Sequence, residues 1–301
     1  MLIFSGTSNP ALARKIAKKL DTKLSSLEIY KFPDKEVRVR VLENVVDKQA
    51  IVVQSTGIHP NHYYMQLFFI LDAIKRSGGS EVTLVIPYLG YQRQDHIFRS
   101  GEAVSLEVIV NLIKAMQVDR VISFDLHAPR ISEFFTNRKI KMDHLSALPV
   151  FAKEIEKMDM KNLVLVSPDM GGIRRIKILA SLLNDQVPCI SIEKNRDLNT
   201  GEIKSTKING EVRKIAVIVD DVISTGKTLI AAAELLRKNG AQEIFVMATH
   251  GIFAGEAPVA LQNSIIKRVT IADTLEVRSK RKFEKLHIIS VSPLITEALR
   301  K

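Results

Sequence analysis

Residues 214–236 have the sequence KIAVIVDDVISTGKTLIAAAELL, which predicts a strand, a polar loop and a helix in succession. The run IAVIV favours a buried strand, and the acids Asp220 and Asp221 follow it. Apolar residues at helical spacing begin after the loop. The free N–H groups and the positive dipole end of a helix N-terminus attract phosphate groups. The segment therefore predicts an α/β fold with a phosphate site at this strand–helix junction.

The loop itself favours a sugar phosphate as its ligand. Gly226-Lys227-Thr228 is similar to part of an ATP-binding P-loop, but that motif needs a glycine where Asp221 stands. A carboxylate repels a triphosphate, whereas it accepts hydrogen bonds from the vicinal hydroxyls of a sugar. A capped helix beside two incidental acids is the alternative. The residues predicted for the sugar-phosphate site are Asp220, Asp221, Ser224, Thr225, Gly226, Lys227 and Thr228.

The rest of the chain continues the alternation of strands and helices. Apolar strand-like runs lie at 50–53, 82–88, 120–124, 163–167, 215–219 and 243–249. Helical patterns separate them, which predicts mainly parallel sheets flanked by helices.

An internal repeat predicts a duplicated domain. DAIKRSGGSEVTLVI (72–86) is similar to ELLRKNGAQEIFVMA (234–248), with a basic pair, a glycine and a strand in the same order. We expect a first domain over residues 1–147 and a second over 148–285. The C-terminal segment 286–301 is expected to pack back on the first domain.

Composition limits the possible partners. The formal net charge is +11, which favours a polyanionic ligand, either nucleic acid or a small phosphorylated compound. No helix-turn-helix pattern is evident, so we expect no nucleic-acid partner. The stretch 49–71 has no Asp, Glu, Lys or Arg, but it contains His59, Pro60, Asn61 and His62, so no membrane span is expected. A single cysteine, Cys189, and the lack of a signal-peptide pattern predict a cytoplasmic protein.

Beyond the loop, four further regions resemble one family. The sugar-phosphate loop resembles that of the type I phosphoribosyltransferase fold, which transferases, regulators and ribose-phosphate diphosphokinases share. The other regions resemble the ribose-phosphate diphosphokinase family in order, and together they span nearly the whole chain. They are KFPDKEVRVR (31–40), IPYLGYQRQDHIFRSGEAVS (86–105), VISFDLHAPRISEFF (121–135), and SPDMGGIRR (167–175) with EKNRDLNTGE (193–202).

The resemblance implies two duplicated phosphoribosyltransferase-like domains and assigns roles to residues. The first two regions would bind ATP, with region 31–40 donated across a subunit interface, although taken alone it favours an exposed hairpin. Lys35 stands where the family usually has glycine, and Arg130 and Glu133 stand where it typically has glutamine and glycine. The residues expected around ATP are Phe32, Asp34, Lys35, Glu36, Arg93, Gln94 and Asp95.

Metal and catalytic roles follow from the same resemblance. His127 and Asp169 would bind Mg²⁺. A carboxylate suits this hard cation, whereas the assignment of His127 depends on the resemblance alone. Lys194 and Arg196 would form the catalytic pair, with Arg196 also near the sugar phosphate.

The implied activity is transfer of the β,γ-diphosphate of ATP to the C1 hydroxyl of ribose 5-phosphate, with AMP as the second product. The resemblance further implies dimers assembled into a hexamer. A phosphoribosyltransferase, which consumes the activated sugar, and a non-catalytic regulatory homologue are the alternatives.

Overall fold

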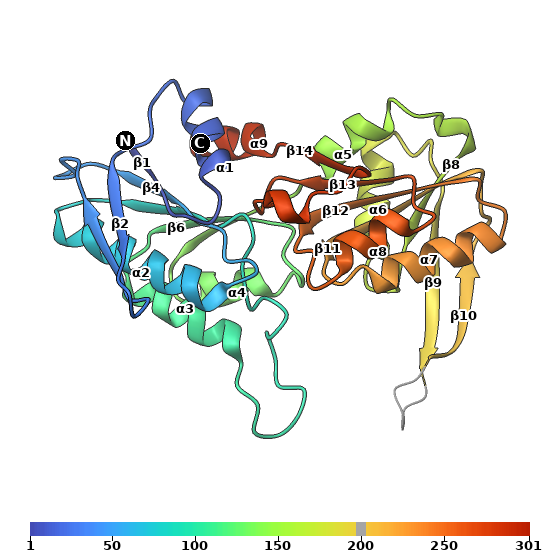
Figure 1. Cartoon of the computed structure of the whole chain (residues 1–301), viewed down its shortest axis with the longest axis horizontal. Coiled ribbons are helices and arrows are strands. Elements are labelled where there is room, and N and C mark those ends of the chain that lie inside the picture. The colour runs from blue at the N-terminus through green and yellow to red at the C-terminus, as the bar shows by residue number, and fades with distance from the viewer. Residues whose placement is uncertain (197–202) are drawn as a thin grey trace. The chain divides into compact units, whose positions relative to one another are not determined.

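The computed structural model describes residues 1–196 and 203–301, with the side chains of 194–196 and 203–206 left out. It divides into two compact units (Figure 1). The first unit comprises Met1–Leu145, Thr274–Glu276 and Ser290–Lys301, and the second comprises Ser146–Asp273 and Val277–Ile289. In the part of the chain so described, no helix is long and apolar enough to cross a membrane.

The first unit is built on a five-stranded parallel sheet of order β1-β4-β5-β6-β7. Its strands are β1 (Leu2–Ser5), β4 (Ala50–Val53), β5 (Val82–Val85), β6 (Arg120–Phe124) and β7 (Lys141–Leu145). Its helices are α1 (Pro10–Lys19), α2 (Pro60–Arg76), α3 (Ser105–Ala115), α4 (Ile131–Thr136) and α9 (Ser292–Leu299). A separate antiparallel hairpin is formed by β2 (Leu27–Lys31) and β3 (Val37–Val41).

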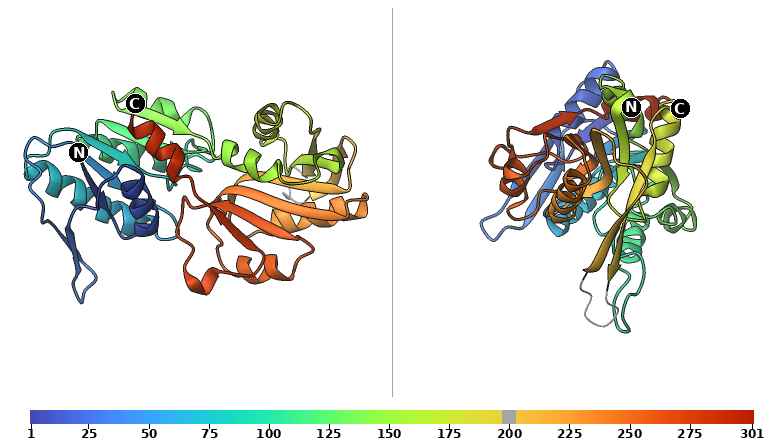
Figure 2. Two further views of the ribbon diagram at one scale, coloured as in Figure 1. Left: turned by 90° about the horizontal axis from the view of Figure 1, so that it is seen from above. Right: turned by 90° about the vertical axis from the view of Figure 1, so that its right-hand side faces the viewer.

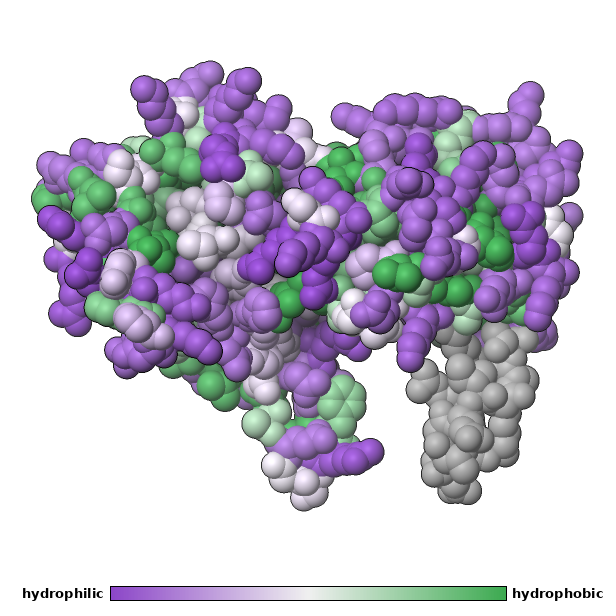
Figure 3. Space-filling view, viewed as in Figure 1, coloured by the Kyte–Doolittle hydropathy of each residue, from purple (hydrophilic) through white to green (hydrophobic). Residues whose placement is uncertain are grey.

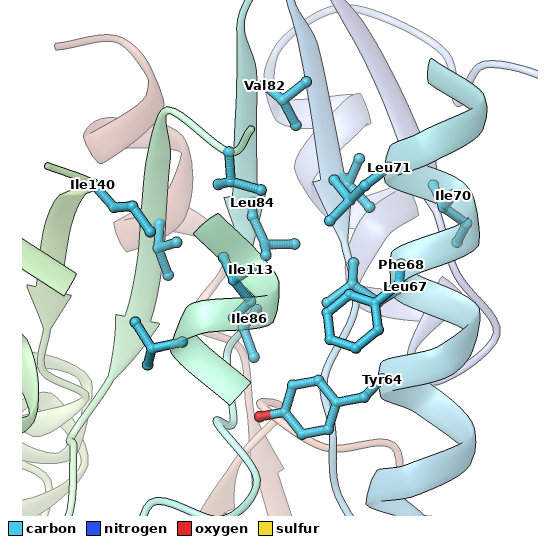
Figure 4. Packing of buried hydrophobic residues seen from close by; sticks show 14 of the residues in the cluster. Tyr64, Leu67, Phe68, Ile70, Leu71, Val82, Leu84, Ile86, Ile113 and Ile140 are labelled. Carbon is cyan, nitrogen blue, oxygen red and sulfur yellow. The ribbon is translucent and has the colours of Figure 1, made fainter. Parts of the chain in front are cut away.

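Helices cover both faces of this sheet. α2 and α3 lie on one face, and α1 and α9 lie on the other (Figures 1 and 2). All four residues of β4 and of β5 are buried, as expected for parallel strands covered on both sides. Leu67, Leu71 and Tyr64 of α2 pack toward Leu84 and Ile86 in the core (Figure 4).

The second unit is built on a seven-stranded sheet of order β10-β9-β8-β11-β12-β13-β14, in which only the β10–β9 pair is antiparallel. Its strands are β8 (Leu163–Ser167), β9 (Cys189–Arg196), β10 (Ile203–Asn209), β11 (Ile215–Ile223), β12 (Glu243–Gly251), β13 (Arg268–Ala272) and β14 (Leu286–Ile289). Its helices are α5 (Leu148–Ile155), η1 (Met160–Asn162), α6 (Ile173–Leu182), α7 (Lys227–Lys238), α8 (Ala257–Asn263) and η2 (Ser279–Arg281). α5 and α6 cover one face, and α7 and α8 the other (Figure 2).

The internal repeat corresponds to the same local structure in both units. Gly78, with φ of +89°, lies two residues after the end of α2, and Gly240, with φ of +102°, lies two residues after the end of α7. The N–H of Gly79 donates to the carbonyl of Ile74, and that of Ala241 to Leu236, at 3.0 Å in each case. This is the Schellman pattern, which needs a left-handed residue that glycine adopts without strain. Each turn leads directly into the next strand, β5 or β12.

The predicted fold class is confirmed, and two details differ from expectation. β11 extends to Ile223, so the twin acids lie inside the strand instead of beyond its end. The C-terminal segment is divided: Leu286–Ile289 pairs with β13 in the second unit, whereas α9 belongs to the first. The hydrophobic pattern at 286–289 fits a strand at the edge of a sheet, which is why it joins the second sheet.

Candidate active site

The twin aspartates lie near the carboxyl edge of the second sheet. Asp220 pairs in register with Ala248 of β12 and is half-buried, while Asp221 is 6% exposed. The Oδ1 atom of Asp220 accepts the N–H of Asp221 at 2.8 Å. Two adjacent carboxyl groups in a buried place need a compensating cation or a shared proton.

Arg175 supplies that cation, a role that no local sequence pattern indicates. It comes from the first turn of α6, and its side chain is 17% exposed. Its Nη1 lies 3.4 Å from Asp220 Oδ1 and its Nη2 lies 3.6 Å from Asp221 Oδ1. One guanidinium therefore faces both carboxyl groups, and it holds them side by side.

Burial nevertheless raises the pKa of Asp220 from 3.8 to about 8, and the neighbouring Asp221 adds to this shift. Arg175 acts in the opposite direction. The folded state therefore binds this proton more tightly than the unfolded state does. The protonated carboxyl group of Asp220 therefore contributes its full stabilisation of the folded state below pH 3.8. This stabilisation is lost as the pH rises toward about 8.

We therefore expect the ligand-free protein to lose stability as the pH rises through this window, and Asp220→Asn to flatten the profile. Urea midpoints measured at a series of pH values would show both effects. Parallel profiles for the wild type and Asp220→Asn would contradict the assignment.

Removal of Arg175 is expected to destabilise the second unit. Arg175→Ala leaves the buried acids without a cation, which costs at least about 1–3 kcal/mol of unfolding free energy. Arg174→Ala is the matched control, because Arg174 is exposed and forms no ion pair with an acid in the described part of the chain. Its replacement should change stability by less than about 0.5 kcal/mol. Urea unfolding of both variants measures the difference, and equal losses would show that Arg175 does not stabilise the pair.

The phosphate loop follows the acids and ends at Gly226, the N-cap of α7. Gly226 has φ of +76°, in the left-handed region, and no side chain caps the helix. A Cβ at this position would lie 3.2 Å from Cγ of Leu261 in α8, so both the backbone angle and the packing require glycine. Thr225, Lys227 and Thr228 are exposed and Ser224 is half-buried. The uncapped, exposed helix start is suited to an anion.

Asp169 lies at the same edge of the sheet. β8 is the neighbour of β11, with Val166 opposite Ile218, and Asp169 follows in the loop before α6. Its Oδ1 accepts the N–H of Gly172 at 3.0 Å, and its other carboxylate oxygen makes no hydrogen bond within the described part of the chain. The carboxylate is exposed and can therefore receive a cation.

The described residues contain no group of three or more His, Cys, Asp or Glu side chains arranged to hold a metal. Mg²⁺ characteristically binds through one or two carboxylates together with substrate phosphates, so a single exposed carboxylate fits this ion. In the first unit His127 is exposed, and its backbone N–H donates to Gln92 Oε1 at 2.9 Å.

The candidate catalytic residues Lys194 and Arg196 are placed only by their backbone, because their side chains lie outside the described part. β9 runs parallel to β8, with Ser191 opposite Ser167, so Lys194 and Arg196 extend beyond the carboxyl edge of the sheet. There they pair with Thr206 and Ile203 of β10. β9 and β10 project from the sheet together (Figure 1).

The hairpin turn at 32–36 presents an aromatic ring and acids to solvent. Phe32 is 37% exposed and packs edge-on against Tyr30, with ring centroids 4.9 Å apart. Asp34 Oδ1 accepts the N–H of Glu36 at 3.0 Å. Lys35 has φ of +77°, and this left-handed backbone gives the physical reason why glycine suits the position.

The loop after β5 carries the other predicted ATP residues. Arg93 and Gln94 are exposed, whereas Asp95 is only 5% exposed. The hydrogen bond and charge of Arg130 lower the pKa of Asp95 to about 2. The chain beyond Asp95 projects from the unit (Figure 1), and exposed Ile97 and Phe98 lie on it. Hydrophilic side chains cover most of the face seen in Figure 3, with hydrophobic ones in small groups among them.

The structure brings the predicted site residues together in two groups, one in each unit. Asp169, Asp220 and the loop before α7 share the carboxyl edge of the second sheet. His127 and loop 93–95 share that of the first. No hydrogen bond or ion pair joins the turn 32–36 to residues 93–96 in the described chain.

A parallel sheet with paired aspartates and a glycine-started phosphate loop at its carboxyl edge defines the type I phosphoribosyltransferase-like class. Family models narrow this class: residues 1–116 match the N-terminal domain of ribose phosphate pyrophosphokinase, and residues 185–301 match the phosphoribosyl synthetase-associated domain. The chain belongs to the ribose-phosphate pyrophosphokinase family.

Individual relatives agree with this assignment over the full length. The chain is 40% identical to a ribose-phosphate pyrophosphokinase of Caldanaerobacter subterraneus, over 99% of this chain and 93% of the relative. It is 39% identical to that of Aquifex aeolicus, over 99% and 94%. Among solved structures, phosphoribosylpyrophosphate synthetase from Mycobacterium smegmatis matches with a TM-score of 0.91 and 31% identity, over 99% of this chain and 97% of that one.

Proposed function

We propose that this enzyme transfers the β,γ-diphosphate of ATP to the C1 hydroxyl of ribose 5-phosphate, giving 5-phosphoribosyl 1-diphosphate and AMP. The observation that carries the proposal is an arrangement at the carboxyl edge of the second sheet: twin aspartates held by Arg175 lie beside an uncapped, glycine-started helix. Family membership supplies the reaction class.

Each part of the site then has a task. The amides and hydroxyls of residues 224–228 bind the phosphate group of ribose 5-phosphate. Asp220 and Asp221 accept hydrogen bonds from the vicinal hydroxyls of the ribose. Phe32, Asp34, Lys35 and Glu36, together with Arg93, Gln94 and Asp95, form the nucleotide-binding segments. Alignment of the sugar hydroxyl with the β-phosphorus provides much of the rate enhancement, because diphosphoryl transfer needs little covalent help.

Charge neutralisation is the other task. Lys194 and Arg196 offset the charge that develops between the β-phosphoryl group and its leaving oxygen. Asp169 and His127 are each proposed as ligands of Mg²⁺, and this ion would supply electrostatic stabilisation of the phosphate oxygens. The net charge of +11 suits an enzyme whose substrates are both polyanions.

The family resemblance of the sequence implies self-association as well. We propose dimers that assemble into a hexamer, with the turn 32–36 contributed to a neighbouring copy. Light scattering of the purified protein would measure the assembly.

A direct assay tests the function. Purified protein with ATP, Mg²⁺ and ribose 5-phosphate, without any nucleobase, is expected to release AMP, and omission of the sugar phosphate should abolish the release. A phosphoribosyltransferase would be inactive in this mixture and would require the activated sugar and a base. A non-catalytic homologue would bind ligands without releasing AMP.

A further inference from the structure

Arg130 makes several polar contacts in the first unit that the proposed mechanism does not use. It stands at the start of α4, and its Nε lies 2.8 Å from Asp95 Oδ2. Its Nη2 lies 2.6 Å from His96 Nδ1, and the same ring nitrogen lies 2.7 Å from Asp95 Oδ1. Glu133 is the other charged group near the guanidinium.

These contacts matter because Asp95 is buried. Ion pairs between exposed groups contribute little to a fold. Here the arginine side chain is 48% exposed, but the aspartate side chain is only 4% exposed. A carboxylate in such a place depends on its partner, so loss of the guanidinium would force Asp95 to move, take up a proton or recruit water. Arg130 therefore decides where Asp95 lies.

The position of Asp95 in turn fixes its neighbours. A hydrogen bond and an ion pair join the loop after β5 to the turn after β6: Gln92 Oε1 accepts the N–H of His127, and Asp95 pairs with Arg130. Arg93 and Gln94 lie between Gln92 and Asp95 in the sequence, and their side chains are exposed. The stretch is thus held at both ends, while the side chains proposed for the nucleotide remain accessible.

We propose that Arg130 is a positioning residue for the nucleotide: through Asp95 it holds Arg93 and Gln94 in the arrangement that binds ATP. This role rests on the proposed function. In this proposal Asp95 fixes the conformation of the loop, because contacts from His96 and Arg130 engage both of its carboxylate oxygens.

Arg130→Gln removes the charge and keeps a side chain of similar reach. It is expected to raise the KM for ATP about tenfold or more, because small misplacements of binding groups are costly. The KM for ribose 5-phosphate should not change, since that site lies in the other unit. Arg130→Lys, which keeps the charge without the planar fork, should fall between the wild type and Arg130→Gln.

Arg138→Gln is the matched control. Arg138 pairs with Glu107 at 2.7 Å in the same unit and does not contact the loop 92–96. Arg138→Gln should lose about as much thermal stability as Arg130→Gln and should keep the wild-type KM for ATP. In an Asp95→Asn background, Arg130→Gln should add little further change to that KM, because the two residues act as a unit.

A wild-type KM for ATP in folded Arg130→Gln would overturn the positioning role while the proposed function stands. If the wild type released no AMP, the proposed function would fail instead. Calorimetric titration with ATP·Mg²⁺ tests the positioning role separately. Weaker binding by Arg130→Gln than by the wild type supports the role. Equal binding by the two proteins refutes it, and so does a wild type that binds no ATP·Mg²⁺.

Discussion

Lys194→Ala is expected to lower kcat about a hundredfold or more, with little change in the KM for either substrate. A preorganised cation that meets charge developed only in the transition state contributes about 2.7–4 kcal/mol to lowering the barrier. The backbone of Lys194 lies on β9, beyond the carboxyl edge of the second sheet, where it pairs with Thr206 of β10. Steady-state kinetics with both substrates varied would measure the effect.

Lys207→Ala provides the comparison for this variant. Lys207 is an exposed residue of β10, the partner strand, and pairs in register with Glu193. Its replacement removes a positive charge from the same hairpin and should leave kcat unchanged. Near-normal turnover by Lys194→Ala, or an equal loss in both variants, would remove Lys194 from the mechanism.

Gly226→Ala is expected to raise the KM for ribose 5-phosphate about tenfold to a hundredfold. A left-handed backbone costs a non-glycine residue about 1–2 kcal/mol, and the new Cβ would press on Leu261. Relief of this strain shifts the loop, and loss of one charge-assisted hydrogen bond to the phosphate costs about 1.5–3 kcal/mol. Kinetics at saturating ATP would show the change.

Gly240→Ala is the control that distinguishes the effect of backbone strain from the effect of a displaced loop before α7. Gly240 also has a left-handed backbone, with φ of +102°, but a Cβ there would meet no atom within 4 Å. This variant should lose stability and keep its affinity for ribose 5-phosphate. A similar KM in both glycine variants would argue against phosphate binding at the loop before α7.

Much of the fold follows from local sequence patterns. The apolar runs at 50–53, 120–124 and 163–167 coincide with β4, β6 and β8, because parallel strands buried on both faces are continuously hydrophobic. The repeat predicted the two related units through its glycine turns. Several strands, among them β1, β7 and β13, and the split of the C-terminal segment were not predicted. Polar residues interrupt the apolar pattern of β7 and β13.

The candidate site was predictable only in part. The loop before α7 and the acids preceding it have a local signature, whereas Arg175 and Arg130 do not. Arg175 reaches Asp220 across 45 positions of the chain and Arg130 reaches Asp95 across 35, so no local pattern shows either pairing. The left-handed backbone of Lys35 likewise became visible only in the folded turn.

Identification of the products by ³¹P nuclear magnetic resonance tests the central claim most directly. The protein with ATP, Mg²⁺ and ribose 5-phosphate should yield AMP and a sugar carrying two coupled phosphorus nuclei, in equal amounts. Formation of ADP, whether with a sugar bisphosphate from transfer of a single phosphoryl group or with free phosphate from hydrolysis, would contradict diphosphoryl transfer.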